Sequence, residues 1–523
     1  MALDDPNLDE LITLIRDSFR VRENHNPIYL DVAGNLGRVR SPQFQVLFGR
    51  RGSGKSCLLV HYDQISKGTD TLTVYIGGDT VKRLQYPDLL VRLVLIVLES
   101  LPNSRPTGWQ RFFRRPHPLN AQITGLRTLL DSAASARVQE QQGESWTSGA
   151  EVGVNQGPVS GALRDSRTGS RELTLDYRAE KVDSLERHLE DYRSLLRKYM
   201  EKGGVKRLDI IIDDFYLLKR AVQPDVVDYL HRLTRGLNAY LKVGTVRHRT
   251  QLARYEDGQL IGIELREDME QIDLDRTFED IGSTQDYLSS LLNSMGKQVG
   301  IAEATGTYLS EPGLFHLTLA SGGVPRDYLN IFVDAVDQAR RLGLTRVTPK
   351  AVYRAAASHS YKTKLSHLKG DAGSDAAALE RVLVDLVSFC LQEKRKTAFL
   401  ISQDEVLSFE REHDVIRQLV DFKLIHVLEP DTSAASGRSG RYEAYTLDFS
   451  LFMEPRRRGI ELVEFWKTDT GRRKQGVREA PAYPLDRVTR ALNLGTEAEP
   501  LDRVVSKATE GLAEMESDEG LDE

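Results

Sequence analysis

Short apolar runs alternate with amphipathic helical patterns over residues 41–280 of the chain. Each run is rich in β-branched residues and bounded by polar residues or glycine, which is typical of buried strands. Five strands are expected: Phe44–Phe48, Leu72–Gly78, Arg207–Asp213, Tyr240–Val246 and a last one within Ile261–Leu274. The helical patterns between them are Cys57–Tyr62, Pro87–Leu101, Asp183–Tyr199 and Val226–Leu237. Strands that alternate with helices in this way predict an α/β fold with a parallel sheet.

The pattern becomes mainly helical after this sheet. Three expected helices, Tyr287–Met295, Glu311–Ser321 and Arg326–Leu342, predict a helical lid, and residues 362–376 are expected to be a linker. Beyond the linker, helices are followed by two strands around a Ser/Gly-rich turn, which is the order of a winged helix. These elements are Ala377–Leu391, Ala398–Ile401, Asp404–Glu410, Asp414–Phe422, Leu424–Leu428 and Tyr442–Leu447.

The first apolar run ends in the glycine-rich stretch Gly49–Ser56, which opens the next helical pattern. Strand, glycine loop, Lys-Ser and helix follow one another in the order of a P-loop. The glycines let backbone N–H groups point at phosphate oxygens. Lys55 can reach the β- and γ-phosphates, and the Ser56 hydroxyl can ligate Mg²⁺. The expected nucleotide-binding residues here are Gly49, Arg50, Arg51, Gly52, Ser53, Gly54, Lys55, Ser56 and Cys57.

Two carboxylates, Asp213 and Asp214, end the third apolar run. Ligands bind at the carboxyl ends of parallel strands, so Asp213 is expected to hold Mg²⁺ as a Walker-B aspartate. Asp214 is expected to orient or deprotonate the attacking water; an ordinary strand-to-turn junction is the alternative. At the end of the next strand, Thr245 and Arg247 are candidates for sensing the γ-phosphate, and a solvated strand end is the alternative.

The stretch Ser321–Leu329 joins two of the expected lid helices. Glycine ends the first helix and Pro325 starts the second. Arg326 falls in the first turn, where the helix dipole disfavours a cation. We therefore expect Arg326 to reach a phosphate, with surface solvation as the alternative.

The predicted architecture is a P-loop NTPase core with a parallel sheet, a helical lid and a winged-helix domain. Its boundaries are 1–40 for an N-terminal helix and lead-in, 41–280 for the core, 281–365 for the lid, 376–450 for the winged helix, and 451–523 for a basic segment and a disordered acidic tail. A polar insertion at about 102–177 interrupts the core and contains a candidate hairpin at Glu151–Val154. The lead-in can supply apolar contacts to an adenine ring or pack on the sheet edge.

Composition adds limits on partners and location. The 523 residues carry a net charge of −6, so any contact with nucleic acid must come from a local basic patch. Only Cys57 and Cys390 are present, which excludes a disulfide framework and fits a reducing compartment. The N-terminus is acidic and the apolar stretch Leu89–Leu101 is shorter than the ~20 residues of a membrane span. A cytoplasmic protein with no membrane partner is expected.

The basic candidates lie in the last part of the chain. They are the turn Gly437–Arg441 and the clusters Arg456–Arg458 and Arg472–Lys474, which flank the aromatic Phe465–Lys467. In contrast, the candidate recognition helix Asp414–Phe422, together with the residue after it, holds only Arg417 and Lys423 as cations. That composition is poor for reading DNA, and packing against protein is the alternative.

With these motifs in this order, residues 20–450 resemble the AAA+ ATPases of the origin-recognition and initiator clade and the related STAND signalling ATPases. The resemblance implies ATP and Mg²⁺ as ligands, a sensor-2 role for Arg326 beside Pro325, and a sensor-1 role for Thr245 or Arg247. It also implies assembly into a homo-oligomer or with partner ATPase subunits, one of which would supply an arginine finger. Asp214 stands where glutamate is common, which favours slow hydrolysis.

Two functions from different classes follow. The first is an ATP-driven switch that couples its nucleotide state to duplex DNA through the winged helix. The second is a signalling or scaffold ATPase, for example in bacterial defence, whose winged helix and partners are protein-directed. A structural protein with an inactive nucleotide site is a third possibility.

Overall fold

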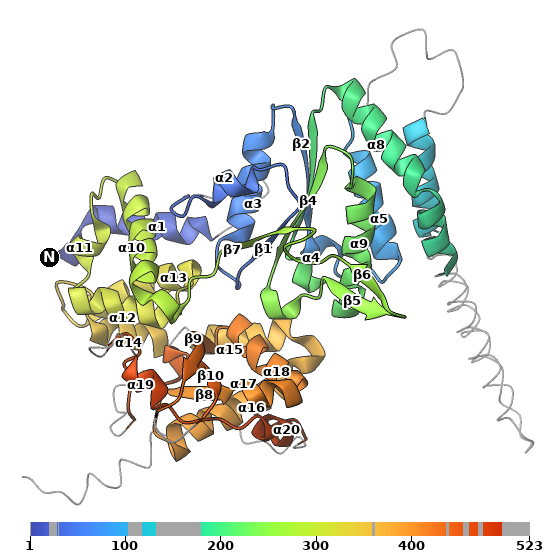
Figure 1. Cartoon of the computed structure of the whole chain (residues 1–523). Helices are drawn as coiled ribbons and strands as arrows, with labels where there is room; N and C mark the ends of the chain where they lie inside the picture. Colours follow the sequence, from blue (N-terminus) through green and yellow to red (C-terminus); the bar gives the residue numbers. More distant parts are fainter. Residues whose placement is uncertain are drawn as a thin grey trace, which may run out of the picture.

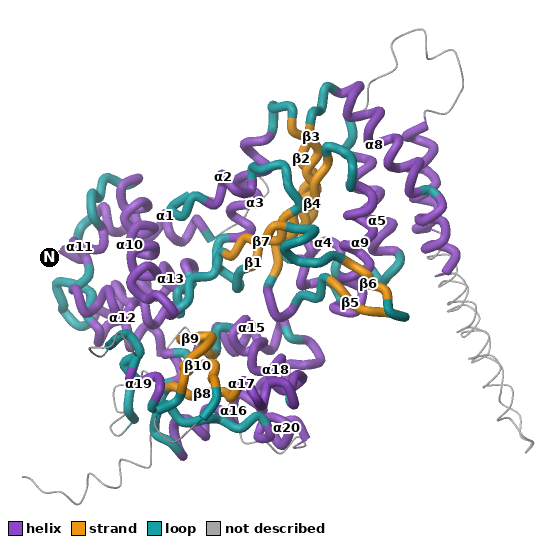
Figure 2. Tube along the Cα trace, in the orientation of Figure 1, coloured by secondary structure: helices purple, strands orange, loops and turns teal. Residues whose placement is uncertain are grey.

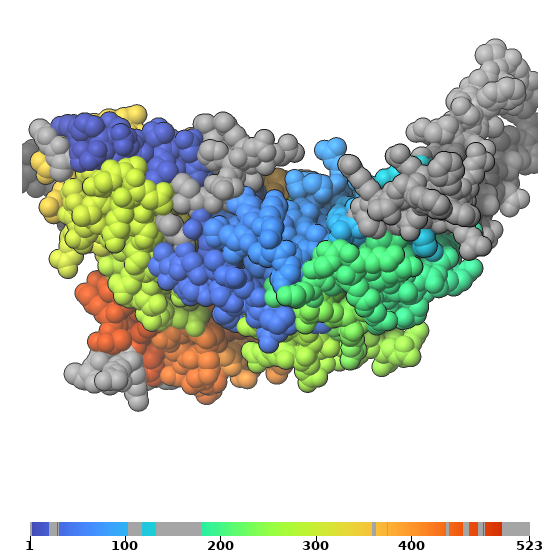
Figure 3. Space-filling view, turned by 90° about the horizontal axis from the view of Figure 1, so that it is seen from above, coloured from blue at the N-terminus to red at the C-terminus, as the bar shows by residue number. Residues whose placement is uncertain are grey.

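The computed structural model describes residues 2–19, 29, 31–102, 118–131, 179–357, 361–435, 439–452, 460–468 and 474–493 (Figure 1). A central sheet with helices on both sides lies beside a group of helices, and a smaller sheet with its own helices lies against both (Figures 1 and 2). The space-filling view shows this last part, in orange, in contact with the core and with the yellow-green helices (Figure 3).

The central sheet has five strands in the order β2-β3-β4-β1-β7, and all four pairings are parallel. The strands are β1 (Gln45–Phe48), β2 (Thr71–Gly77), β3 (Arg207–Asp213), β4 (Ala239–Thr245) and β7 (Glu270–Asp273). This confirms the predicted α/β fold with a parallel sheet. Only the last part of the predicted strand Ile261–Leu274 is β7, because the residues before it belong to a separate hairpin of β5 (Ala253–Glu256) and β6 (Gln259–Gly262).

Alternate residues of the central strands face two helical layers, as the period of a strand requires. Ile210 and Ile212 of β3 pack with α5, α8 and α9, whereas Ile211 packs with α3. These helices are α3 (Lys55–Ser66), α5 (Asp88–Glu99), α8 (Leu189–Gly203) and α9 (Gln223–Thr234). The single helix predicted over Asp183–Tyr199 is two helices, 179–187 and α8, because the backbone of His188 (φ −97°, ψ 4°) leaves the helical conformation.

The predicted lid is a group of helices that also contains the N-terminal helix. Its members are α1 (Pro6–Ser18), α10 (Ile281–Gln298), α11 (Ala304–Tyr308), α12 (Glu311–Ser321), α13 (Pro325–Arg341) and α14 (Pro349–Ala355). Helix α1 is capped by the Asp5 side chain, which accepts a hydrogen bond from Asn7 N. Leu8, Leu11 and Ile15 of α1 share the apolar core of the lid, so this helix packs there.

The C-terminal part contains a three-stranded antiparallel sheet in the order β8-β10-β9. Along the chain its elements are α16 (Ala376–Val387), β8 (Ala398–Ser402), α17 (Gln403–Ser408), α18 (Glu410–Asp421), β9 (Ile425–Ser433) and β10 (Arg441–Leu447). Residues 362–376 were predicted to be a linker, and that prediction is wrong. They lie mostly in α15 (Tyr361–Asp371), which buries Lys364 and Leu368 and so has a helical face that packs.

One apolar core runs through the lid and the C-terminal sheet: Tyr328 and Phe332 of α13 belong to the same cluster as Leu400 of β8. The predicted aromatic segment Phe465–Lys467 also takes part. The Phe465 ring stacks on Phe278 with 5.2 Å between centroids, and Trp466 contacts Phe315. These aromatic rings therefore pack against the lid and do not form a nucleic-acid surface.

Several predictions lie outside the described residues: Glu151–Val154, Arg456–Arg458, Arg472 and Arg473, and the acidic tail 495–523. Of the insertion 102–177, the structure describes Pro102 and the helix 118–131, which packs Leu119 and Leu126 into the core beside α5.

Among the described residues, no helix has the length and apolar character needed to cross a membrane. Other short helices are α2 (Asn35–Val39), α4 (Gly78–Val81), α19 (Gln475–Arg478) and α20 (Asp486–Asn493).

Candidate nucleotide site

The loop after β1 folds around the start of α3. Gly52 and Gly54 adopt φ values of 94° and 100°, which residues with a Cβ rarely take. Ser53 Oγ is buried and has no hydrogen-bond partner among the described residues. Lys55 Nζ donates to the carbonyl oxygens of Gly49 at 2.5 Å and Arg50 at 3.3 Å. A buried unpaired hydroxyl beside a lysine and a helix N-terminus fits a bound phosphate.

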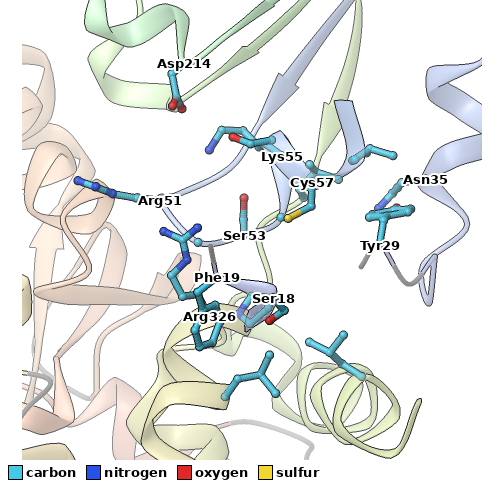
Figure 4. A pocket seen from close by; sticks show the side chains of 18 of the residues that line it. Ser18, Phe19, Tyr29, Asn35, Arg51, Ser53, Lys55, Cys57, Asp214 and Arg326 are labelled. Carbon is cyan, nitrogen blue, oxygen red and sulfur yellow. The ribbon is translucent and has the colours of Figure 1, made fainter. Parts of the chain in front are cut away.

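A cavity of about 420 Å³ opens between this loop, the lid and α15 (Figure 4). Several separate parts of the chain line it. Among its lining residues are Arg51–Leu58 from the loop and α3, Asp214, Tyr216 and Leu217 after β3, Pro325, Arg326 and Leu329 from α13, and Ser18, Phe19, Tyr29 and Asn35 from the N-terminal segment. The cavity therefore contains the loop residues Arg51, Gly52, Ser53, Gly54, Lys55, Ser56 and Cys57 that were predicted to bind a nucleotide.

The two carboxylates after β3 have different environments. Asp213 is buried: its Oδ2 accepts from Tyr75 Oη at 2.7 Å and its Oδ1 accepts from Asp214 N at 2.8 Å. Asp214 lines the cavity in a left-handed conformation with φ 50°. Burial and the neighbouring Asp213 raise the pKa of Asp214 to about 6. Asp214 is thus a stronger base than an exposed aspartate.

Lys55 is 4% exposed, and burial lowers its pKa while Asp214 and Asp213 act in the opposite direction. Lys55 and Asp214 line the same cavity. The lid approaches from the other side, where Arg326 N donates to Gly52 O at 3.2 Å. In Figure 4 the Arg326 guanidinium points toward the loop, facing the same cavity as Lys55 and Asp214.

Five predicted site residues do not line this cavity. Arg50 is buried behind the loop and donates to Asp275 (3.2 Å), His426 (3.2 Å) and the carbonyls of Arg276 and Gly322. Thr245 Oγ1 is hydrogen-bonded to Thr250 Oγ1 at 2.5 Å. Arg247 is paired with Asp273 and lies over the Phe48 ring at 4.3 Å. Gly49 and Asp213 are the other two residues that do not line the cavity.

The cavity also contains residues that the sequence did not single out. Tyr29 belongs to the lead-in, where contacts to a base were one expectation, and Tyr216 follows the two carboxylates. Arg276 lies over the ring of Tyr287 at 4.8 Å, both at the lid side of the cavity. Asp371 comes from α15, and no local signal pointed to it because this segment resembled a linker.

The side chains at this site could bind Mg²⁺ only if a bound phosphate supplied further ligands. Ser56 lines the cavity and Asp213 is buried at the end of β3; their joint role as metal ligands stays a prediction. Within the described part of the chain, no group of three or more His, Cys, Asp or Glu side chains could hold a metal ion by itself. Mg²⁺ usually completes its octahedral shell with water and substrate phosphates in such sites.

No protein-family model matches the chain, and no curated protein matches it. Among solved structures, Cdc6p from Pyrobaculum aerophilum is similar with 12% identity, coverage of 96% of this chain and 98% of that chain, and a TM-score of 0.34. The ORC2 protein of Aeropyrum pernix has 12% identity, coverage of 94% and 98%, and a TM-score of 0.36. The Walker-type ATPase paby2304 of Pyrococcus abyssi has 10% identity, coverage of 82% and 97%, and a TM-score of 0.37. Similarity at this level does not identify an activity.

Proposed function

We propose that the protein is a Mg²⁺-dependent, AAA+-like ATPase that works as a nucleotide-controlled switch. The observation that supports this best is that the phosphate loop, Asp214 and Arg326, which are far apart in sequence, line one cavity at the carboxyl ends of the parallel strands. In this proposal Lys55, the loop N–H groups and Ser53 hold the phosphates. Ser56 and Asp213 hold Mg²⁺, which supplies charge stabilisation to the phosphate oxygens when bound.

Asp214 is the proposed general base. Because its pKa is about 6, it is ionised at pH 7 and can accept the proton of the attacking water. Tyr75 donates to Asp213 and so fixes the orientation of that carboxylate. Arg326 would stabilise charge on the terminal phosphate from the lid side. ADP and phosphate would be the products, and product release would let the lid relax.

Loss of Lys55 tests the proposed function. We expect Lys55→Ala to weaken ATP binding by at least about tenfold, because a charged hydrogen-bond donor to phosphate contributes ~1.5–3 kcal/mol. Binding of a fluorescent ATP analogue and phosphate release would both be measured. Lys67→Ala is the matched control, since Lys67 follows the same helix but is exposed and paired with Asp63. Equal ATP binding by the Lys55 variant and the wild type would contradict the proposal.

A second prediction concerns pH. A base with a pKa of about 6 is about 90% ionised at pH 7 and about 10% ionised at pH 5. ATP hydrolysis by the wild type should therefore fall about tenfold between these two pH values, provided that ATP is saturating. Nucleotide binding measured at both pH values separates this effect from loss of affinity. A hydrolysis rate that stays constant to pH 5 would exclude Asp214 as the base.

The C-terminal part is proposed to be a winged helix over residues 376–450, because its order of helices and strands is that of the motif. We also propose the functional division into lead-in (1–40), core (41–280), lid (281–365) and basic segment with tail (451–523). The candidate recognition helix is α18. It faces the core: Asp414 pairs with Arg220 at 2.9 Å and Asp421 accepts from His248 N at 2.9 Å.

This docking favours the second candidate function, a signalling or scaffold ATPase with protein targets. The only two cations of the candidate recognition helix and the residue after it have partners in the same chain, Arg417 with Glu443 at 3.3 Å and Lys423 with Asp327 at 2.8 Å. Sizing the protein with ATP, ADP or no nucleotide, each with and without duplex DNA, separates the two functions. Oligomers that depend on ATP and ignore DNA support the protein-directed switch. Salt-sensitive DNA binding supports the DNA-directed one.

A further inference from the structure

Arg51 connects the phosphate loop to the C-terminal end of α15. Its Nη1 donates to Asp371 Oδ2 at 2.5 Å, and both residues line the cavity. The carbonyl oxygen of Asp371 accepts a second hydrogen bond from Arg249, at 2.5 Å. The Arg249 guanidinium lies over the rings of Tyr216 and Phe422 at 4.6 and 5.0 Å. The end of α15 is therefore held by two arginines of the core, one of them in the phosphate loop.

This contact differs from the ion pair that joins Lys423, just after α18, to Asp327 of the lid helix α13. The side chains of Arg51 and Asp371 are 43% and 24% exposed, whereas those of Lys423 and Asp327 are 4% and 14% exposed. A partly exposed ion pair contributes little to stability, whereas a buried one leaves an unpaired charge when it breaks. The Arg51 pair can therefore exchange partners while the Lys423 pair holds α18 and the lid together.

The position of Arg51 also suits a phosphate. The residue lines the cavity one position before Gly52, and the proposed base Asp214 lines the same cavity. A guanidinium can form two parallel hydrogen bonds with a phosphate and binds it more strongly than a neutral partner would. A terminal phosphate brings more negative charge to this point than the single carboxylate of Asp371.

We propose that Arg51 distinguishes ATP from ADP by leaving Asp371 for the terminal phosphate, and that this exchange loosens the C-terminal end of α15. The inference rests on the proposed function, because it requires that the cavity binds both nucleotides. With ADP the Arg51–Asp371 pair persists. With ATP the end of α15 and the following turn η8 (Gly373–Asp375) are released from the loop, while the buried Lys423–Asp327 pair keeps α18 attached.

The test is amide hydrogen exchange of residues 365–375 in the full chain, with no nucleotide, with ADP and with a non-hydrolysable ATP analogue. Only the ATP analogue should accelerate exchange in this segment. Asp371→Asn should show fast exchange in all three states and bind the ATP analogue about threefold to fivefold more tightly, because the competing ion pair is lost. Arg51→Gln should bind the ATP analogue at least about tenfold more weakly, with ADP affinity changed less than twofold.

Nucleotide affinities are measured on the same samples, so a failure of the proposed function can be distinguished from a failure of the Arg51 inference. If the wild type binds neither nucleotide, the proposed function is overturned and this inference with it. If both nucleotides bind and exchange in 365–375 is the same, only the inference is overturned. Equal losses of ATP and ADP affinity in Arg51→Gln would also overturn it. Arg38→Gln is the matched control, because Arg38 forms a similarly exposed pair with Glu270 away from the cavity.

Discussion

Replacing Asp214 with asparagine is expected to lower ATP hydrolysis at least about a hundredfold and to leave ATP binding within about threefold. The neutral amide cannot accept a proton from water, and general-base catalysis typically contributes ~10²–10⁴ in rate. Asparagine tolerates the left-handed backbone of this position (φ 50°), so the strand end should keep its structure. Steady-state phosphate release and titration with an ATP analogue would be measured side by side.

Asp257→Asn is the matched control for this experiment. Asp257 has the same φ of 50°, but lies at the turn of the β5–β6 hairpin. The control should hydrolyse ATP at the wild-type rate. If Asp214→Asn retained more than a tenth of that rate, another group would have to act as the base, and the role proposed for the raised pKa would be wrong.

Removing the carboxylate of Asp448 is expected to destabilise the protein by about 3–5 kcal/mol, because it leaves buried charged and polar partners without an acceptor. Asp448 Oδ2 accepts from Lys364 Nζ at 2.5 Å and from His426 Nε2 at 2.8 Å, and all three side chains are at most 2% exposed. Burial alone would raise the pKa of Asp448, but Lys364 and His426 hold it below its usual value. The carboxylate is therefore ionised in the folded protein.

The expected measurement is the free energy of unfolding of Asp448→Ala from urea titrations followed by circular dichroism. Asp431→Ala is the control, since Asp431 forms an exposed pair with Arg441 in the same sheet. Its unfolding midpoint should stay close to that of the wild type. Equal unfolding midpoints for the two variants would show that the buried cluster contributes no more than a surface pair.

His426 links this cluster to the phosphate loop. Burial lowers the pKa of His426 to about 4, so the ring is neutral at pH 7. Because arginine can only donate, His426 Nδ1 accepts from Arg50 Nη1, and Nε2 must then donate to Asp448. A hydrogen-bonded path thus runs from the loop through the imidazole to the C-terminal part. Asp448→Ala should weaken this connection as well as the fold.

The sequence predicted the features that depend on local order. The strands around Ile210 and Val243 are apolar on both faces because helices cover both sides of the sheet, and this pattern can be read without a structure. The phosphate loop was predictable for the same reason, since glycine spacing and the following helix fix its shape. Asp214 and Arg326 were singled out by their positions at a strand end and a helix start.

Other features depend on packing that no local pattern records. Arg50 and Arg51 are adjacent and chemically identical, yet one is buried against His426 and the other lines the cavity. Likewise, Arg247 follows the end of β4 as expected for a sensor, but Asp273 at the end of β7, on the far side of β1, pairs with it. Asp371 lies in a segment rich in glycine and serine, and its helix forms because Lys364 and Leu368 are buried by tertiary contacts.

The apolar core shared by the lid and the C-terminal sheet has a mechanical consequence. Gly322, at the turn before α13, leaves no room for a Cβ, which would lie 2.2 Å from the His426 ring of β9. Together with the shared apolar cluster that contains Tyr328 and Leu400, this contact joins the lid and the C-terminal sheet into one rigid unit. When the lid rotates by a small angle around a bound nucleotide, the C-terminal strands should therefore move with it. A chain truncated between the lid and the C-terminal sheet would lose the part that moves with the lid and the surface that covers it.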